Sequence, residues 1–422
     1  MAELESQGLK RRRRVLESQQ GARVRVDGRD YVAFCSNDYL GLAAHPELIE
    51  AAREGAARHG VGAGASHLLS GHTTAHRELE ERLAAFVGLP RALLFSAGYL
   101  ANIGVVTALV GRGDAVFADR LNHASLNDAA LLSRAVFRRY PHLDLAALER
   151  LLSASQARRR LIVTDAVFSM DGDIAPVPAL VALAERYGAW LLLDDAHGFG
   201  VLGPQGRGTL AHFSARSPRI IYMATLGKAA GVSGAFAAAD ATAIEMLVQR
   251  ARPYVYTTAT PPLLSVALVK SLDLIRDGDA RRQRLQQLIA LLQERLRPER
   301  RPRSNDPLRS PSLPDRDGTG RRTLERGWRL APSSTAIQPL LIGDASEAVA
   351  VSENLAHAGL LVPAIRPPTV PRGTARLRIS LSAAHSPQDV ERLAATLSEI
   401  ERAVPYSEAH PDPGRNVDDS GR

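Results

Sequence analysis

Cysteine, aromatic side chains and long apolar runs are all scarce in this sequence. The 422 residues include one cysteine, Cys35, which excludes an internal disulfide and leaves no set of cysteines for a zinc site. Such sparing use of cysteine is typical of a reducing compartment, so we expect a cytoplasmic protein. Aromatic residues make up only 5% of the chain. The core must therefore consist mainly of Leu, Val, Ile and Ala.

Membrane and secretion signals are also missing from the pattern. No apolar run approaches the roughly 20 residues that span a bilayer, so we expect no membrane contact. The first residues carry Glu3 and Glu5 and then the basic run 10–14, without the apolar segment of a secretion signal.

The chain carries a formal net charge of +8, a value compatible with a nucleic-acid partner. Much of the excess arginine is concentrated in the run 10–14 and in an Arg/Pro-rich stretch at 295–329. Neither stretch is interleaved with aromatic residues, as a surface for single-stranded nucleic acid would be. Solvated charge or a loop is the better interpretation, and we expect no nucleic-acid partner. A basic nucleic-acid-binding protein with a decayed catalytic site remains the alternative from another class.

Short apolar runs alternate with amphipathic stretches in the first two thirds of the chain. Helical spacing is clear over residues 76–87, where Leu79, Leu83 and Phe86 share a face and Gly88 ends the helix. Continuous apolar strands that alternate with helices predict an α/β fold, with a mostly parallel sheet covered on both faces. The strands are predicted at 92–95, 161–163, 190–193 and 220–223.

The rest of the chain predicts a second, smaller α+β unit with strands near 336–342 and 376–381. We expect an N-terminal segment (1–45), a large domain (46–260), a small C-terminal domain (261–404) and a disordered tail (405–422). The small domain is interrupted by the Arg/Pro-rich insertion, predicted at 297–329.

Ligands of parallel α/β sheets bind beyond the carboxyl ends of the strands. After the first predicted strand, a Gly turn with Gly98 and Tyr99 leads into a helix, which suits a phosphate group but is also common in ordinary turns. After the second strand come Asp165 and the polar loop 168–173.

The third and fourth predicted strands are followed by ionisable residues that could take part directly in catalysis. Asp194, Asp195 and His197 follow one strand, and predict a helix cap, a metal site or an acid that protonates a heterocycle nitrogen. Lys228 follows the next strand between glycines. It is either a surface lysine or, if desolvated, the nucleophile of a Schiff base. Together, a phosphate turn, an acid, a histidine and a lysine at successive strand ends match the needs of pyridoxal-phosphate chemistry.

With these residues the chain resembles the α-oxoamine synthases, a family with the aspartate-aminotransferase fold (fold type I of the pyridoxal-phosphate enzymes). The resemblance covers roughly residues 8–400. It is carried by SNDYLGL (36–42), GAGASHLLSGHTTAH (62–76), ADRLNHASL (118–126), VFSMDGD (167–173), DDAHGFGVLG (194–203), TLGKAAGVSGA (225–235) and RPPTVPRGTARLRI (366–379).

Within the family, IRPPTVP (365–371) and SSTAIQPLLIG (333–343) resemble the biotin-pathway member. That enzyme condenses L-alanine with a pimeloyl thioester, carried on coenzyme A or acyl carrier protein, with loss of carbon dioxide. A sister enzyme resembling glycine C-acetyltransferase or 5-aminolevulinate synthase is the alternative. Asp165 departs from the pattern, since the biotin-pathway members often carry Glu there.

The resemblance implies a role for each candidate residue toward the cofactor, pyridoxal 5'-phosphate. Lys228 binds it covalently and later moves the substrate proton, and Asp194 pairs with the pyridine nitrogen. His197 contacts the phenolic oxygen, while His123 stacks on the ring and also faces the substrate. The cofactor is further held, largely at its phosphate, by Gly98, Tyr99, Ser169 and Thr225, and by Thr258 from the second subunit of a homodimer.

The resemblance also implies a substrate site. Asn37 and Arg378 bind the carboxylate of the amino acid, for which an arginine fork is suited. Thr369, Arg366 and Arg11 face the acyl substrate. No residue of the resemblance implies a metal ion.

Overall fold

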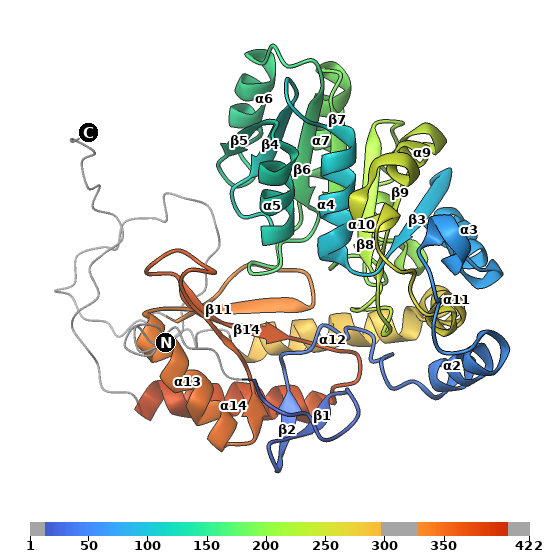
Figure 1. Ribbon diagram of the computed structural model, residues 1–422. Helices are drawn as coiled ribbons and strands as arrows, with labels where there is room; N and C mark the ends of the chain where they lie inside the picture. Colours follow the sequence, from blue (N-terminus) through green and yellow to red (C-terminus); the bar gives the residue numbers. More distant parts are fainter. Residues whose placement is uncertain (1–12, 297–327, 404–422) are drawn as a thin grey trace, which may run out of the picture.

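The computed structural model of the protein describes residues 13–296 and 328–403. Arg11, nearly all of the predicted insertion and the predicted tail lie outside these residues. Within them, no helix is long and apolar enough to cross a membrane. Figure 1 shows two groups of elements, a large sheet with its helices and a smaller sheet beside the long helices α12 and α14.

A seven-stranded sheet forms the larger group, in the order β3-β9-β8-β7-β6-β4-β5. All strands run parallel except β9, which is antiparallel to both neighbours. The four predicted strands are all present, which confirms the α/β expectation. The strands are β3 (Arg91–Phe95), β4 (Ala115–Asp119), β5 (Val136–Tyr140), β6 (Arg160–Asp165), β7 (Trp190–Asp194), β8 (Ile220–Thr225) and β9 (Ala235–Ala239).

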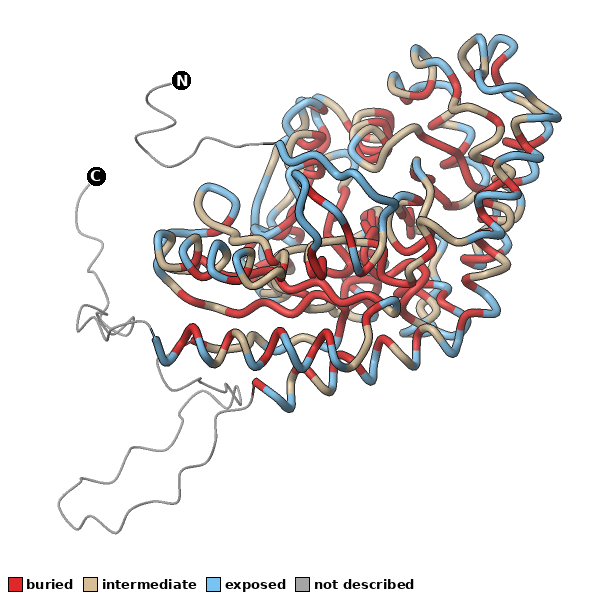
Figure 2. The backbone as a smooth tube through the Cα atoms, turned by 90° about the horizontal axis from the view of Figure 1, so that it is seen from below, coloured by how far each residue is buried: buried red, intermediate tan, exposed pale blue. Residues whose placement is uncertain are grey.

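Helices cover both faces of this sheet, and its strands bury side chains on both. In β7, Leu191 and Leu193 belong to one apolar cluster and Leu192 to the other, as strand alternation requires. The first cluster includes helices α3 (Thr74–Val87), α6 (Leu145–Ser153), α7 (Val177–Arg186), α8 (Thr209–His212) and α11 (Pro262–Arg276). The second includes α4 (Gly98–Leu109), α5 (Ala124–Ser133), α9 (Ala241–Arg250) and α10 (Arg252–Val255). Burial is accordingly concentrated in the centre (Figure 2).

Helix α3 illustrates how the local sequence sets its own boundaries. Thr73 and His76 form a reciprocal capping box at its start. At its end Gly88 adopts a left-handed conformation with φ of 73°, where a residue with a Cβ atom is strained. The predicted helix and its terminating glycine are both confirmed.

The smaller group contains an antiparallel sheet in the order β10-β11-β14-β13. Its strands are β10 (Arg329–Leu330), β11 (Ile337–Gly343), β13 (Ala364–Ile365) and β14 (Ala375–Ser380), and its helices are α12 (Asp279–Arg295), α13 (Ala345–His357) and α14 (Pro387–Ala403). Both strands predicted for this unit are confirmed.

The N-terminal segment pairs with this smaller group. Strands β1 (Arg23–Val26) and β2 (Arg29–Ala33) form a hairpin, and β2 also pairs in parallel with β12 (Leu360–Leu361). Helix α2 (Pro46–His59) packs instead against α11. The remaining elements are the π-helical turn η1 (His67–Gly71) and the 3-10 turn η2 (Pro204–Gly206). The domain boundaries themselves stay a prediction.

The last two residues of the predicted insertion, 328 and 329, belong to the described part of the chain. Trp328 is only 2% exposed, and its indole N–H donates to Glu347 of α13 at 2.9 Å. Arg329 begins β10, which pairs with β11. Sequence patterns do not reveal these residues, because they adjoin the Arg/Pro-rich stretch and a two-residue strand has no pattern of its own. These two residues therefore pack with the small sheet, while residues 297–327 lie outside the described part of the chain.

Candidate active site

Eight predicted site residues line one cavity of about 160 Å³ at the carboxyl edge of the large sheet. They are Gly98, Tyr99, His123, Ser169, Asp194, His197, Thr225 and Lys228. Strands β6, β7 and β8 are parallel neighbours, so the residues that follow them meet at the same edge. The register places Asp165 opposite Asp194 and Asp194 opposite Met223.

Lys228 lies at one end of a continuous chain of hydrogen bonds. Its Nζ is 2.8 Å from Nε2 of His197, whose Nδ1 is 2.6 Å from the hydroxyl of Tyr39. That hydroxyl donates to Oδ1 of Asn37 at 3.1 Å, and the same oxygen accepts from Nη2 of Arg378 at 3.2 Å. The predicted carboxylate-binding pair, Asn37 and Arg378, is thus in contact and joined to Lys228.

These contacts determine the protonation of His197. Tyr39 uses its single proton toward Asn37, so it must accept the hydrogen bond from Nδ1–H of His197. Burial, reinforced by the charges of Lys228 and Arg378, holds the pKa of His197 well below its usual value. The ring is therefore neutral, and its unprotonated Nε2 is the acceptor that faces the amine of Lys228.

The amine of Lys228 is itself unusually easy to deprotonate. Burial lowers its pKa to about 8, although the carboxylates of Asp194 and Asp165 act in the opposite direction. A larger fraction of neutral amine is available near neutral pH than for an exposed lysine, and neutral amine is the nucleophilic form.

Asp194 begins a second network. Oδ2 accepts from the side-chain amide of Asn102 at 2.7 Å, and Oδ1 accepts from the backbone N–H of Ala196 at 3.1 Å. The other amide hydrogen of Asn102 goes to Oγ of Ser125, which lies 2.8 Å from Nδ1 of His123. Burial lowers the pKa of His123, despite the nearby Asp194. This network fixes the ring of His123 beside the cavity.

Asp165 contributes a second acid to the cavity wall. Its Oδ2 accepts from the backbone N–H of His123 at 3.1 Å, whereas its buried Oδ1 has no hydrogen-bond partner. Burial and then repulsion from Asp194 raise its pKa well above the usual value. Although it is one methylene shorter than Glu, the side chain reaches the backbone of His123.

Asp195, in contrast, has a structural role. It faces away from the cavity lining and accepts from the Tyr222 hydroxyl and the Thr209 backbone N–H, both at 2.7 Å. Burial raises its pKa to about 7. Of the two adjacent carboxylates, only Asp194 belongs to the candidate site.

The start of α4 packs closely against β8 at the cavity. A Cβ atom at Gly98 would lie 2.5 Å from Cγ2 of Thr225, so only glycine fits there. Helix α4 directs its first backbone N–H groups toward this end, an arrangement that favours an anion. Oγ1 of Thr225 is buried without a partner. At the surface, Tyr99 donates to Asp128 at 2.5 Å.

The loop 168–173 connects the cavity to both groups of elements. Nε of Arg378 donates to the carbonyl oxygen of Ser169 at 2.6 Å, and Nη1 of Arg376 donates to Asp171 at 2.5 Å. On the other side His142 bridges Asp119 and Asp173 at 3.0 and 2.7 Å. Burial alone would lower the pKa of His142, but its two carboxylate partners raise it to about 10, so the bridge is charged near neutral pH.

Five of the predicted residues that the structure describes lie outside the cavity lining. Asn37 and Arg378 are joined to it through the hydrogen bonds to Tyr39, whereas the other three have no such connection. Thr258 forms an isolated bridge with Ser66, Arg366 is half-buried, and Thr369 is exposed. Tyr39, Asn102 and Ser125 take part in the two networks but were not predicted as site residues. Tyr39 and Ser125 stand in the quoted motifs SNDYLGL and ADRLNHASL, and the sign that points to Asn102 is an amide on the face of an otherwise apolar helix.

Comparison with known proteins identifies the family. The model for aminotransferases of class I and II matches residues 29–397. The chain belongs to this family. It is 63% identical to 8-amino-7-oxononanoate synthase of Nitrosospira multiformis and 61% identical to that of Herminiimonas arsenicoxydans, each alignment covering 94% of this chain and 93% and 97% of the relative.

Solved structures agree with this assignment. One match is a structure of serine palmitoyltransferase (SPT) that contains pyridoxal phosphate (PLP) as an internal aldimine. The TM-score is 0.84 and the identity 28%, over 95% of this chain and 96% of the other. The 8-amino-7-oxononanoate synthase of Francisella tularensis gives a TM-score of 0.71 at 28% identity, with 88% and 98% covered. These matches confirm the predicted fold and family.

The close approach of Gly98 to Thr225 generates a paired test. Gly98→Ala should weaken the affinity for pyridoxal phosphate by about tenfold or more, because the new methyl group displaces the start of α4 from its anion-binding position. The stiff, β-branched Thr225 cannot move aside easily. Absorbance titration of the apoprotein with the cofactor measures the affinity.

Thr225→Ser is the matched control, because it removes Cγ2 and keeps the hydroxyl. Alone it should bind the cofactor nearly as the wild type does, and combined with Gly98→Ala it should restore most of the lost affinity. Equal affinities of Gly98→Ala and wild type would contradict the steric argument.

Proposed function

We propose that this protein carries out the reaction for which its relatives are named. It condenses L-alanine with a pimeloyl thioester and releases carbon dioxide and the free thiol, to give 8-amino-7-oxononanoate in biotin biosynthesis. One observation carries the proposal: relatives of 55–63% identity over more than nine tenths of the chain share this name. The sister enzymes are not favoured, because the relatives in this identity range carry the name of the biotin-pathway enzyme and not that of a sister.

The residues at the cavity fit pyridoxal phosphate. Thr225 offers a buried hydroxyl without a partner, and Gly98 leaves the backbone at the start of α4 open to a phosphate. Ser169 and Tyr99 line the same space. Asp194, fixed by Asn102, would pair with the pyridine nitrogen. The ring would then lie beside His123, with Lys228 in reach of the aldehyde carbon.

When bound, pyridoxal phosphate supplies a ring that accepts the electron pair left when the substrate Cα loses its proton. Lys228 moves that proton, since its lowered pKa makes the amine an effective base near neutral pH. His197 holds Nζ of Lys228 in position through its unprotonated Nε2. Asp194, which Asn102 and the backbone N–H of Ala196 hold in place, would pair with the pyridine nitrogen and so favour the protonated ring.

Two groups of residues would divide the substrates between them. Arg378 and Asn37 would hold the carboxylate of alanine, because Arg378 is joined to Lys228 through Tyr39 and His197. Arg366, Thr369 and Arg11 would face the acyl chain.

We also propose a cytoplasmic homodimer in which Thr258 completes the neighbour's cofactor site. Leu69 is 81% exposed and Tyr256 is 71% exposed, and both are on segments joined by the Ser66–Thr258 bridge. Large apolar side chains gathered on one surface indicate an interaction site.

The homodimer can be tested by mass and by complementation. Light scattering should give about twice the chain mass of 45.4 kDa. Lys228→Ala should be inactive and Thr258→Ala impaired, yet subunits exchanged between the two should regain activity, since one site of each mixed dimer is intact. A fully active monomer would contradict the proposal, and so would a mixture no more active than its components.

The reaction is tested by product analysis. Purified protein with pyridoxal phosphate should convert L-alanine and pimeloyl thioester to 8-amino-7-oxononanoate, detected by mass spectrometry, with one carbon dioxide per thiol released. Parallel assays with coenzyme A and acyl carrier protein identify the carrier. Preference for glycine with acetyl-CoA over alanine with pimeloyl thioester would reject the assignment.

The two arginines should affect different substrates. Arg378→Ala should weaken alanine binding about tenfold or more, because a charged hydrogen bond to the carboxylate is lost. Arg366→Ala should raise KM for the thioester and leave alanine binding near wild type. Alanine is titrated by cofactor absorbance without thioester, and turnover is then measured against thioester concentration. Equal loss of alanine binding in both variants would show that the division is wrong.

A further inference from the structure

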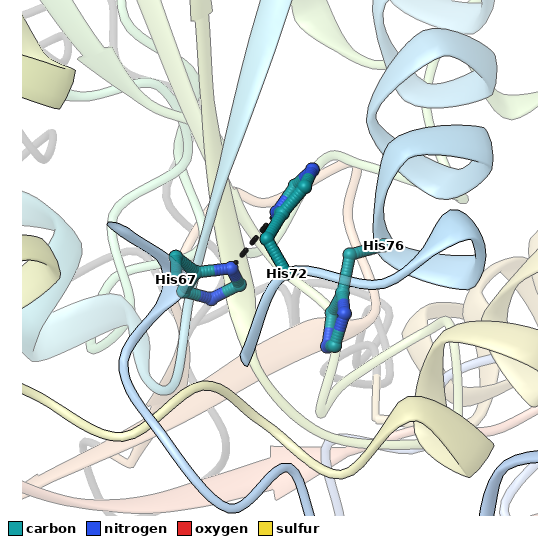
Figure 3. A group of neighbouring side chains, drawn as sticks. All are labelled: His67, His72 and His76. Atoms are coloured by element: carbon teal, nitrogen blue, oxygen red, sulfur yellow. Dashed lines mark hydrogen bonds between the residues drawn. The ribbon is translucent and has the colours of Figure 1, made fainter. Parts of the chain in front are cut away.

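Three histidine rings converge outside the candidate active site. His67 begins η1, His72 follows it, and His76 is in the first turn of α3 (Figure 3). One ligand nitrogen of each ring lies within 4.8 Å of those of the other two. The spacing is H-x4-H-x3-H within the motif GAGASHLLSGHTTAH. The only metal site predicted as an alternative from the sequence was at Asp194 to His197, so these three histidines were not among the predicted residues.

The distance between the first two rings suits a shared cation. Nδ1 of His67 is 3.0 Å from Nδ1 of His72, a contact that now needs one proton between them. Two imidazole nitrogens bound to one tetrahedral zinc ion at about 2.0–2.1 Å lie about 3.3–3.4 Å apart, so the two rings need to separate by only a few tenths of an ångström. A cation can take the place of that proton with little movement of the two rings. The ring that now carries the proton on Nδ1 would then carry it on Nε2 instead.

His76 has the right tautomer to be the third ligand. Its Nε2 is 2.8 Å from the carbonyl oxygen of Thr260, which can only accept, so Nε2 carries the proton. The lone pair is therefore on Nδ1, which accepts from the backbone N–H of Thr73 at 3.1 Å and lies 2.9 Å from the Thr73 hydroxyl. A bound ion would replace these two contacts of the capping box. A second ring nitrogen that donates to a backbone carbonyl is the usual support of a metal-bound histidine.

Charge and burial also favour a cation. Burial lowers the pKa values of all three rings, and the pKa of His67 falls to about 3 with the added repulsion of His76 and His72. The rings are thus neutral, as metal ligands must be. Oε2 of Glu80, whose pKa burial raises to about 7, lies 3.9 Å from Nε2 of His72 on the side away from His67. His67 and His76 are buried while His72 is exposed, which gives an ion a path from solvent.

We propose that His67, His72 and His76 form a binding site for a divalent transition cation, with zinc as the reference ion. Three imidazoles leave one position of a tetrahedral ion for water on the exposed side of His72. Softer or borderline ions fit this donor set better than magnesium or calcium, which prefer oxygen.

The bound ion would have a structural role. The segment 258–260 is attached to this region by the Ser66–Thr258 bridge, by the bond from Ala259 N–H to the Ala65 carbonyl, and by His76. The ion would join η1 to α3 and so stabilise the segment that carries Thr258. The metal site itself does not depend on the proposed reaction.

The test uses the full-length holoenzyme without a histidine tag, first treated with a chelator and then dialysed. Calorimetric titration with zinc chloride should give one ion per chain, with micromolar or tighter affinity. Cobalt(II) should bind to the same site and give visible absorption bands of a nitrogen-coordinated ion, a result independent of activity.

His72→Gln is the informative variant, because His72 is exposed and its replacement leaves the buried rings in place. It should weaken zinc binding at least about tenfold while cofactor absorbance and circular dichroism remain unchanged. His357→Gln, on the exposed side of α13, is the matched control and should bind zinc like the wild type. Absence of stoichiometric binding to the wild type, or equal binding to His72→Gln, would overturn the proposal.

Discussion

The hydrogen bond between the Lys228 amine and Nε2 of His197 determines how the rest of the site is arranged. Nε2 can accept only if the proton of the neutral ring is on Nδ1, and that proton requires an acceptor. Tyr39 provides it because its own proton is directed to Asn37. One buried lysine thus specifies the direction of every hydrogen bond up to Arg378.

This chain of bonds joins parts of the protein that are far apart in sequence. Asn37 and Arg378 are 341 positions apart, and Tyr39 and His197 are 158 apart. Asn37 and Tyr39 come from the segment after β2, His197 follows β7 of the large sheet, and Arg378 is on β14 of the small sheet. The site therefore exists only when the N-terminal segment and both sheets are assembled, which explains why so long a chain is needed for so small a cavity.

Sequence patterns predicted the strands and the residues that follow them for a physical reason. Buried parallel strands are continuously apolar, so a polar residue at the end of one, such as Asp194 or Lys228, is conspicuous. Asn102 was not conspicuous, because its value depends on Asp194, 92 positions away, and no local pattern reveals that partner. For the same reason, the sequence did not show that Asp194 and Asp195 have different roles. The two are distinguished only by the hydrogen bonds that Asp195 accepts from Tyr222 and Thr209.

The position of Arg378 has a thermodynamic consequence. Its guanidinium holds the carbonyl oxygen of Ser169 through Nε and the side chain of Asn37 through Nη2. If a carboxylate engaged this guanidinium in place of Ser169, it would release one of the bonds that position the 168–173 loop, whose far end is held by the charged His142. Binding of a carboxylate at Arg378 and occupancy of the cavity would then be linked. By thermodynamic linkage, if one ligand changes the affinity for the other by some factor, the second ligand changes the affinity for the first by the same factor.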